Sequence, residues 1–323
     1  DLELMFCNTY HLMLQPGIDV IESAGGLHKF IGRKGPIITD SGGFQVFSLA
    51  YGSVADELKS KGTKKTGSQV IKISEEGVVF RSYRDGSRFE LTPESSVAAQ
   101  KVFGADIIIP FDELPPYHMD LTALKASLDR THRWEERSLN AHLSDPRQQS
   151  MYAVIHGGVN DELRKHSCKV LTNMAFDGFA IGGSLGKNHN ELEEVLQSTM
   201  SELPPEFPVH LLGLGDLRSI QMGVRHGIDT FDSAYPTKAA RHGVLYRLNK
   251  EPIRIKSKKY QSAHVPIDSE CDCYTCQHYT QSYMHHLYKA SEPAYIQLAT
   301  IHNVAYMNRL MADIRKGILC DEV

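Results

Sequence analysis

The chain has 323 residues, 41% of them hydrophobic and 23% charged, which suits one large α/β barrel or two ordinary soluble domains. No apolar run approaches the roughly 18 residues of a membrane span, and no secretory signal pattern is present, so we expect a cytoplasmic protein with no membrane partner. The formal net charge of -4 argues, taken alone, against a nucleic-acid partner.

Short apolar runs rich in β-branched residues recur along the chain and predict buried strands. They end in Gly, Asp or a polar turn, and lie at residues 2–7, 36–39, 105–111, 151–155, 178–181, 209–212 and 227–231. Helical stretches separate most of them, such as the one that Thr92 and Pro93 open and the one at 121–143. Strands that alternate with helices predict a parallel sheet, whose buried strands read as continuous apolar runs.

Polar residues and glycines follow these runs directly, as in Asp40-Ser41-Gly42-Gly43 and His156-Gly157-Gly158. Active sites of (β/α)₈ barrels lie at the carboxyl ends of the strands, so the pattern favours an eight-stranded TIM barrel over an open sheet. Seven runs are counted, and the chain starts without Met, so we expect that a first strand is missing from this sequence. A hairpin is predicted around residues 84–86, and a mobile loop over 51–72.

The segment 238–260 carries eight Lys or Arg against one acidic residue, a net +7 that leaves -11 for the rest of the chain. A concentrated basic stripe on an acidic protein is typical of a local grip on a phosphate backbone. A solvated charged face is the alternative.

Three cysteines, Cys271, Cys273 and Cys276, stand within six residues, and His302 follows on a predicted helix. Three thiolates and one imidazole fill the tetrahedral shell of a structural Zn²⁺ and leave no position for substrate. Nearby histidines at 264, 278, 285 and 286 compete for the fourth place. We therefore expect a catalytic barrel over 1–260 and a zinc-binding subdomain over 261–323.

Asp40 and Asp232 follow runs that are far apart in sequence but meet at one mouth in a barrel. Two carboxylates in different environments can break a glycosidic bond, one as nucleophile and the other as acid and then base. Either aspartate can also be a simple loop cap, and spacing alone does not decide between these readings.

Four motifs resemble those of tRNA-guanine transglycosylases, most closely the bacterial type, in the right order through nearly the whole chain. They are Asn8-Thr9-Tyr10-His11-Leu12, residues 40–46 (DSGGFQV), residues 231–237 (FDSAYPT), and residues 268–276 around the cysteines. The resemblance implies a (β/α)₈ barrel with a zinc subdomain and a homodimer. It also implies exchange of guanine at the wobble position of tRNA anticodons for a 7-deazaguanine base, through a covalent intermediate in queuosine modification.

By the same resemblance Asp232 is the nucleophile that attacks C1′ of the ribose, and Asp40 is the general acid/base. The residues that the resemblance places around the base are Ser41, Gly42, Gly43, Phe44, Asp112, His156, Gly183 and Leu212. RNA contacts are implied for Gly213, Leu214, Gly215, Asp216, Leu217, Arg218 and Ser219, and for Thr237, Lys238, Ala239, Ala240 and Arg241. The last segment opens the basic stripe.

The chain departs from the usual pattern at three places near the base. His156 stands where a base-reading Gln is usual, and a neutral imidazole can still donate to a carbonyl. Gly186 falls where bacterial members have Val, so we expect room beside the 7-substituent. Leu114 replaces a Cys and likewise departs from the common bacterial pattern, and together these changes favour queuine over 7-aminomethyl-7-deazaguanine. Two rival functions are an inactive RNA-binding paralogue and a metal-dependent barrel hydrolase.

Overall fold

The computed structural model describes residues 2–320 except 53–56, 59–60, 62–68 and 83. Contacts within the chain divide it into two compact units. The larger is Leu4–Asp232, and the smaller is Ser233–Val323 together with Asp1–Glu3. Each unit is described by itself below. The division at residue 260 that the sequence favours stays a prediction.

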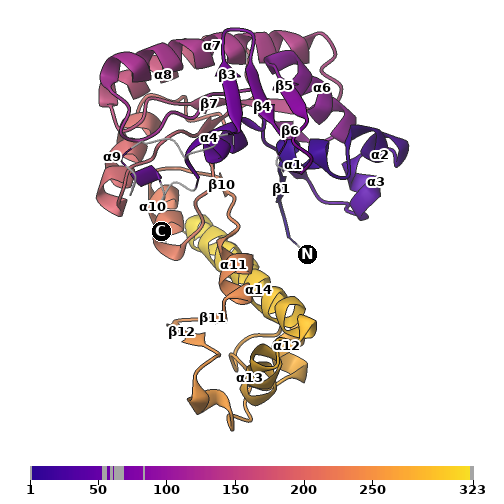
Figure 1. The fold of residues 1–323 in the computed structure, drawn as a ribbon. Coiled ribbons are helices and arrows are strands. Elements are labelled where there is room, and N and C mark those ends of the chain that lie inside the picture. The colour runs from indigo at the N-terminus through magenta and orange to yellow at the C-terminus, as the bar shows by residue number, and fades with distance from the viewer. Residues whose placement is uncertain (1, 53–56, 59–60, 62–68, 83, 321–323) are drawn as a thin grey trace. The chain divides into compact units, whose positions relative to one another are not determined.

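The larger unit is built on seven parallel strands that stand in the sheet in chain order (Figure 1). They are β1 (Met5–Cys7), β2 (Ile37–Thr39), β6 (Ile107–Ile108), β7 (Ser150–Ile155), β8 (Gly178–Ile181), β9 (Val209–Leu211) and β10 (Thr230–Phe231). Each lies within or overlaps a predicted apolar run, and every neighbouring pair is parallel. The α/β class and the half-barrel winding of the strands are thus confirmed.

Helices connect the strands and cover the outside of the sheet, with α6, α7 and α8 lying along one side in Figure 1. Their bounds are α1 (Thr9–Leu14), α2 (Ile18–Ser23), α3 (Leu27–Ile31), α4 (Gly43–Tyr51), α6 (Pro93–Phe103), α7 (Leu121–Leu143), α8 (Asp161–Leu171), α9 (His189–Met200) and α10 (Leu217–Arg225). The predicted start of α6 is correct: Thr92 caps it and forms a reciprocal capping box with Ser95. The predicted bounds of α7 are also confirmed.

A small antiparallel sheet is inserted after α4. It consists of β3 (Val70–Ile73), β4 (Val78–Arg81) and β5 (Arg88–Leu91), and the register pairs Arg81 with Arg88 across the predicted turn. The predicted loop 51–72 lies for the most part outside the described residues. Its described end is not a loop, because β3 begins at Val70 and pairs with β4.

The smaller unit has a hydrophobic core of its own, centred on buried Met284, Tyr295 and Ala299. Its elements are α11 (Tyr235–Arg241), β11 (Val244–Arg247), β12 (Lys250–Arg254), η1 (Lys258–Tyr260), α12 (Tyr274–His278), α13 (Gln281–Lys289) and the long α14 (Pro293–Leu319). Helix α11 lies against α14, where the Tyr295 hydroxyl donates to the Ala240 carbonyl at 3.0 Å (Figure 1). None of the helices in the described ranges is both long and apolar enough to cross a membrane.

Candidate active site and candidate metal centre

The carboxyl ends of the parallel strands bring the predicted catalytic and base-binding residues of the larger unit to one edge of the sheet. Asp40 follows β2, Asp112 follows β6, His156 follows β7, and Gly183 follows β8. Asp232 directly follows β10. Because parallel strands all point the same way, residues more than 100 positions apart meet at this edge.

Asp40 is held by two donors from the segment after β1. The Thr9 amide donates to Oδ1 at 2.8 Å, and the Asn8 side-chain amide donates to Oδ2. Burial raises the pKa of Asp40 to about 7; the Thr9 bond opposes this rise, and the negative charges of Asp112 and Asp232 add to it. A carboxyl with such a pKa exchanges its proton at physiological pH, as a general acid that later acts as a base must do.

Asp232 accepts two hydrogen bonds on the same oxygen. The Gly213 amide donates to Oδ1 at 2.7 Å, and Nε2 of His210 lies 3.1 Å from it. The Thr230 hydroxyl lies 2.8 Å from Nδ1 of His210, so a Thr-to-Nδ1 bond places the ring proton on Nε2, facing the carboxylate. These contacts fix the orientation of the carboxylate, which suits a nucleophile.

The sequence did not single out His210, which is fully buried in the middle of β9. Its ring stacks on Phe6 with centroids 6.0 Å apart. The available signal was one polar residue inside the apolar run 209–212.

Asp112 forms the centre of a second polar cluster. The Ser41 hydroxyl donates to Oδ1 at 2.7 Å, and the Gly43 amide donates to the Ser41 oxygen at 3.1 Å. A Cβ on Gly43 would lie 2.3 Å from the Asp112 carbonyl oxygen, so no other residue fits there. The serine and glycines of the 40–46 motif thus position Asp112 as much as they line the site.

His156 is buried, and its Nε2 lies 2.9 Å from Oδ2 of Asp112. If the ring is neutral, its single proton serves this bond, and Nδ1 remains a buried atom with no partner among the described residues. Nδ1 lies against Gly183, since a Cβ there would come within 2.8 Å of it. In this arrangement Nε2 of His156 is used by Asp112, so it is not the donor to the base that the sequence led us to expect.

Arg164 of α8 links the segment after β7, which contains His156, to the segment after β8. The sequence did not single out this residue. Its buried guanidinium donates to the carbonyls of Ile155 and Gly158 at 2.8 Å, and to those of Gly182 and Ser184 at 2.9 and 3.2 Å. Burial lowers the pKa of Arg164 to about 10, so it keeps its charge at neutral pH. Four carbonyl acceptors take the place of the carboxylate that usually accompanies a buried arginine.

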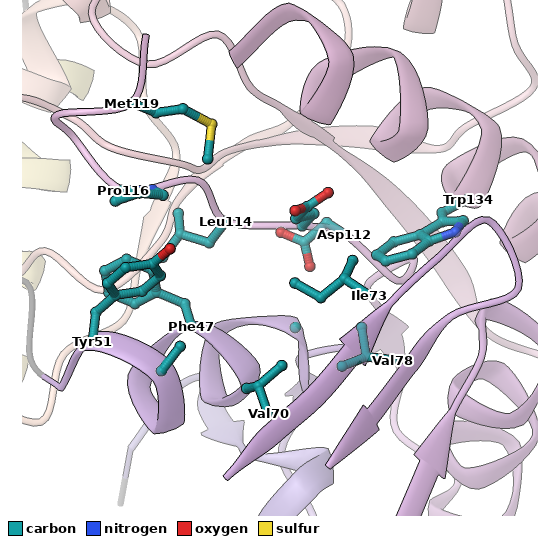
Figure 2. Close-up of a pocket in the computed structure, with 13 residues that line it drawn as sticks. Phe47, Tyr51, Val70, Ile73, Val78, Asp112, Leu114, Pro116, Met119 and Trp134 are labelled. Carbon is teal, nitrogen blue, oxygen red and sulfur yellow. The ribbon is translucent and has the colours of Figure 1, made fainter. Parts of the chain in front are cut away.

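Leu114 lines a cavity of about 40 Å³ beside Asp112, together with Tyr51, Pro116 and Met119 (Figure 2). That space holds a few water molecules and is too small for a purine. Phe44, predicted to stack on the base, is 44% exposed at the start of α4 and is free to do so.

Gly186 does not border open space as the sequence argument required. A Cβ at this position would lie 2.5 Å from Cβ of Glu191, and the backbone φ is +97°. Glu191 also accepts bonds from the Lys187 amide at 3.0 Å and the Tyr117 hydroxyl at 3.1 Å. The missing side chain is therefore explained by the packing of this loop on α9.

In the predicted RNA-contacting segment 213–219, Asp216 and Ser219 form hydrogen bonds within the protein. Asp216 caps α10 by accepting from the Ser219 amide at 3.2 Å, and Ser219 is buried. Gly213, Leu217 and Arg218 are the exposed members.

In the smaller unit, Lys238 and Arg241 project from the exposed side of α11, whereas Ala239 and Ala240 are buried. The rest of the basic stripe lies on β11, β12 and η1, where Lys250, Arg254 and Lys258 are exposed. The basic residues named here are therefore accessible to a partner.

The four predicted metal ligands come together in the smaller unit. Nδ1 of His302, on α14, lies 3.8, 3.5 and 3.3 Å from the sulfurs of Cys271, Cys273 and Cys276. A tetrahedral Zn²⁺ with bonds of about 2.3 Å to sulfur and 2.05 Å to nitrogen separates such atoms by about 3.6 Å. The cluster therefore fits a zinc ion, and none of the competing histidines belongs to it.

His302 also has the second contact that is typical of a metal-bound histidine. Its Nε2 donates to the Tyr246 carbonyl of β11 at 2.7 Å, which leaves Nδ1 unprotonated for the ion. A zinc ion here would tie the cysteine loop to α14 and, through His302, to the β11–β12 hairpin.

Comparisons with known proteins agree over the whole chain. A family model described as queuine tRNA-ribosyltransferase matches residues 1–323. The queuine tRNA-ribosyltransferase of Protochlamydia amoebophila is 62% identical over 318 residues, which cover 98% of this chain and 82% of that protein. Those of Chlamydia felis and of Chlamydia trachomatis serovar A are 55% and 54% identical over 324 residues, covering 100% of this chain and 87% of theirs.

Proposed function

The chain belongs to the queuine tRNA-ribosyltransferase family and is a transferase, and from this premise we propose how its residues carry out the exchange. Asp232 attacks C1′ of the ribose at the wobble guanosine and forms a covalent bond to the RNA as the glycosidic bond breaks. Asp40 protonates the departing guanine. In the second half, Asp40 removes a proton from the incoming 7-deazaguanine, which displaces Asp232 from C1′.

The observation that carries this proposal is the difference between the two carboxyl environments. Burial raises the pKa of Asp40 to about 7, whereas the Oδ1 atom of Asp232 accepts from Gly213 and lies 3.1 Å from the His210 ring. Base exchange requires an acid that exchanges its proton near neutral pH and a nearby carboxylate that donors hold in one orientation.

Around the base, we propose that Asp112 accepts from its N–H edge, that the Gly183 amide donates to its carbonyl, and that Phe44 stacks on its ring. His156 acts in this scheme by holding Asp112 in place, in keeping with their 2.9 Å contact. The wobble nucleotide must be unstacked to reach the site, and the bases of an anticodon loop are accessible for this.

For the RNA, we propose contacts from the exposed residues of 213–219 and from Lys238 and Arg241 on α11. Their charges open the stripe 238–260, whose net charge is +7 on an otherwise acidic chain. The protein acts on tRNA as a homodimer in the cytoplasm; size-exclusion chromatography with light scattering tests the dimer.

For the incoming base, we propose queuine over 7-aminomethyl-7-deazaguanine. The support is Leu114, which departs from the usual bacterial Cys. Gly186 adds none, since Glu191 occupies the side of Gly186 where a valine would stand. For the same reason Gly186→Val would strain the loop and is not a clean test. The direct test compares the catalytic efficiency of the wild-type protein for the two bases. A preference for 7-aminomethyl-7-deazaguanine contradicts the proposal.

The two rival functions are separable from exchange. An inactive paralogue lacks a catalytic pair, whereas both Asp40 and Asp232 are present here. A metal-dependent hydrolase needs ligands at the strand ends, and within the described residues the groups able to hold a metal lie elsewhere.

The test of the proposed function is incorporation of radiolabelled guanine into tRNA, together with denaturing gels that detect a covalent complex between protein and tRNA. Wild-type protein should give both, and Asp232→Asn should give neither while still binding tRNA. Exchange without any trappable complex would contradict the covalent route.

A further inference from the structure

A second group of metal-binding side chains lies on the helices of the larger unit, away from the strand ends. Asp129 and His132 are three positions apart on α7, and His166 is on the neighbouring α8. One ligand atom from each lies within 4.8 Å of the other two. Residues three apart share a helix face, so Asp129 and His132 both present themselves to α8.

The two imidazoles have the spacing of ligands to one ion. Their ring centres are 5.6 Å apart, with planes inclined by 53°. Two rings on one tetrahedral Zn²⁺, with Zn–N bonds of about 2.1 Å, place their centres about 5 Å apart. A small change of side-chain rotamer brings the observed pair to that distance.

His132, the buried histidine of the pair, has one ring nitrogen available to a metal. Nε2 of His132 lies 3.0 Å from the Ser167 hydroxyl, which leaves Nδ1 as the nitrogen for an ion. This bond joins His132 of α7 to α8, the helix that also carries His166.

Nearby charges do not block the group. Arg133, which lies next to His132 in the chain, is turned to Glu75, with Nε and Nη2 each 2.8 Å from a carboxylate oxygen. Asp129 and His166 are partly or fully exposed. Solvent can therefore supply the remaining ligands of an ion bound here.

We propose that Asp129, His132 and His166 form a second metal site, which takes a divalent transition ion such as Zn²⁺, Ni²⁺ or Co²⁺ between α7 and α8. Two imidazoles and one carboxylate suit these ions, and an incomplete protein shell makes this ion exchangeable, in contrast to the one at the cysteines. The ion clamps α7 to α8. Its effect can reach the base pocket, because Ser167 also accepts from the His156 amide at 3.3 Å.

The first test is metal stoichiometry. Protein equilibrated with buffered Zn²⁺ and then analysed for bound metal should hold two ions per chain, whereas His166→Ala and Asp129→Asn should hold one. Both side chains are at least partly exposed, so these changes should leave the fold intact. His286→Ala removes an exposed histidine of α13 and, as the matched control, should keep two.

The second test uses Trp134, the only tryptophan of the chain, which stands two residues after His132 on α7. Co²⁺ added to protein that holds zinc at the cysteines alone should quench its fluorescence, without the intense thiolate bands that replacement at the cysteines would give. The quenching should require about tenfold or more Co²⁺ in His166→Ala. One zinc per chain in the wild type, a second ion retained by either variant, or quenching that is equal in His166→Ala overturns the proposal.

Discussion

The contact between Asn8 and Asp40 gives a quantitative prediction for the pH dependence of guanine release. The Asn8 side chain caps α1 by accepting from the His11 amide at 2.9 Å, and its amide group donates to Oδ2 of Asp40. Asn8→Ser keeps a good cap and removes the donor to Asp40. The ionised form of Asp40 then loses a hydrogen bond, so its pKa rises.

The expected size follows from the energy of that bond. A hydrogen bond to a charged group contributes about 1.5–3 kcal/mol, and 1.36 kcal/mol corresponds to one pH unit. Because the Thr9 amide still donates at 2.8 Å, we expect the lower end, a change of about one pH unit. Asp40 must be protonated to release guanine, so the rate should fall above pH 7 in the wild type and about one unit higher in Asn8→Ser.

The assay is single-turnover release of labelled guanine from tRNA between pH 5 and 9, with Asn160→Ser as the control. Asn160 caps α8 in the same way, through the Leu163 amide at 3.0 Å, and takes no part in the Asp40 cluster. If the fall in rate at high pH occurs at the same pH in Asn8→Ser as in the wild type, or at a lower pH, this account of Asp40 is refuted.

Protein stability offers an independent check of the same pKa. The folded-state pKa of Asp40, about 7, lies above the ordinary value of 3.8, so the folded protein holds this proton more tightly than the unfolded chain. The stability that protonation contributes is complete below about pH 4 and is lost as the pH rises to about 7. The free energy of unfolding of wild type relative to Asp40→Asn should fall over this range, by at most roughly 4 kcal/mol.

Four further predictions concern other residues. Asp232→Asn should abolish exchange and the covalent complex with little loss of tRNA binding, as gel trapping and filter binding will show. His210→Phe should lower kcat with little change in the Michaelis constant for the base, because it removes the ring that faces Oδ1 of Asp232; an unchanged kcat would deny it a positioning role. Cys273→Ser should reduce zinc content and lower the melting temperature, since structural zinc contributes folding free energy; full zinc retention would exclude it as a ligand. Lys238→Ala and Arg241→Ala should raise the Michaelis constant for tRNA, and each lost phosphate contact should reduce the salt slope by about 0.7–0.9; an unchanged slope would place the RNA elsewhere.

The sequence by itself determined the strands, the start of α6 and the three clustered cysteines, because each depends on neighbours in the chain. A buried parallel strand must be an apolar run, so all seven strands were found at the predicted runs. Thr92 and Pro93 begin α6 through local hydrogen bonds, and Cys271, Cys273 and Cys276 stand within six residues. Only the folded structure selects His302 over the competing histidines as the fourth member of the cluster. Asp40 and Asp232 were found through the motifs at residues 40–46 and 231–237, each of which begins at or just before the aspartate.

Only the tertiary structure decided what surrounds those carboxylates, since that depends on contacts between distant segments. Asn8 donates to Asp40 across 32 positions, and His210 faces Asp232 across 22. Arg164 reads in sequence as an ordinary helix residue, yet its guanidinium joins the ends of β7 and β8 through the carbonyls of Ile155 and Gly182. The free energy of a buried charge or hydrogen bond is set by the atoms packed around it, and these are fixed only when the strand ends meet.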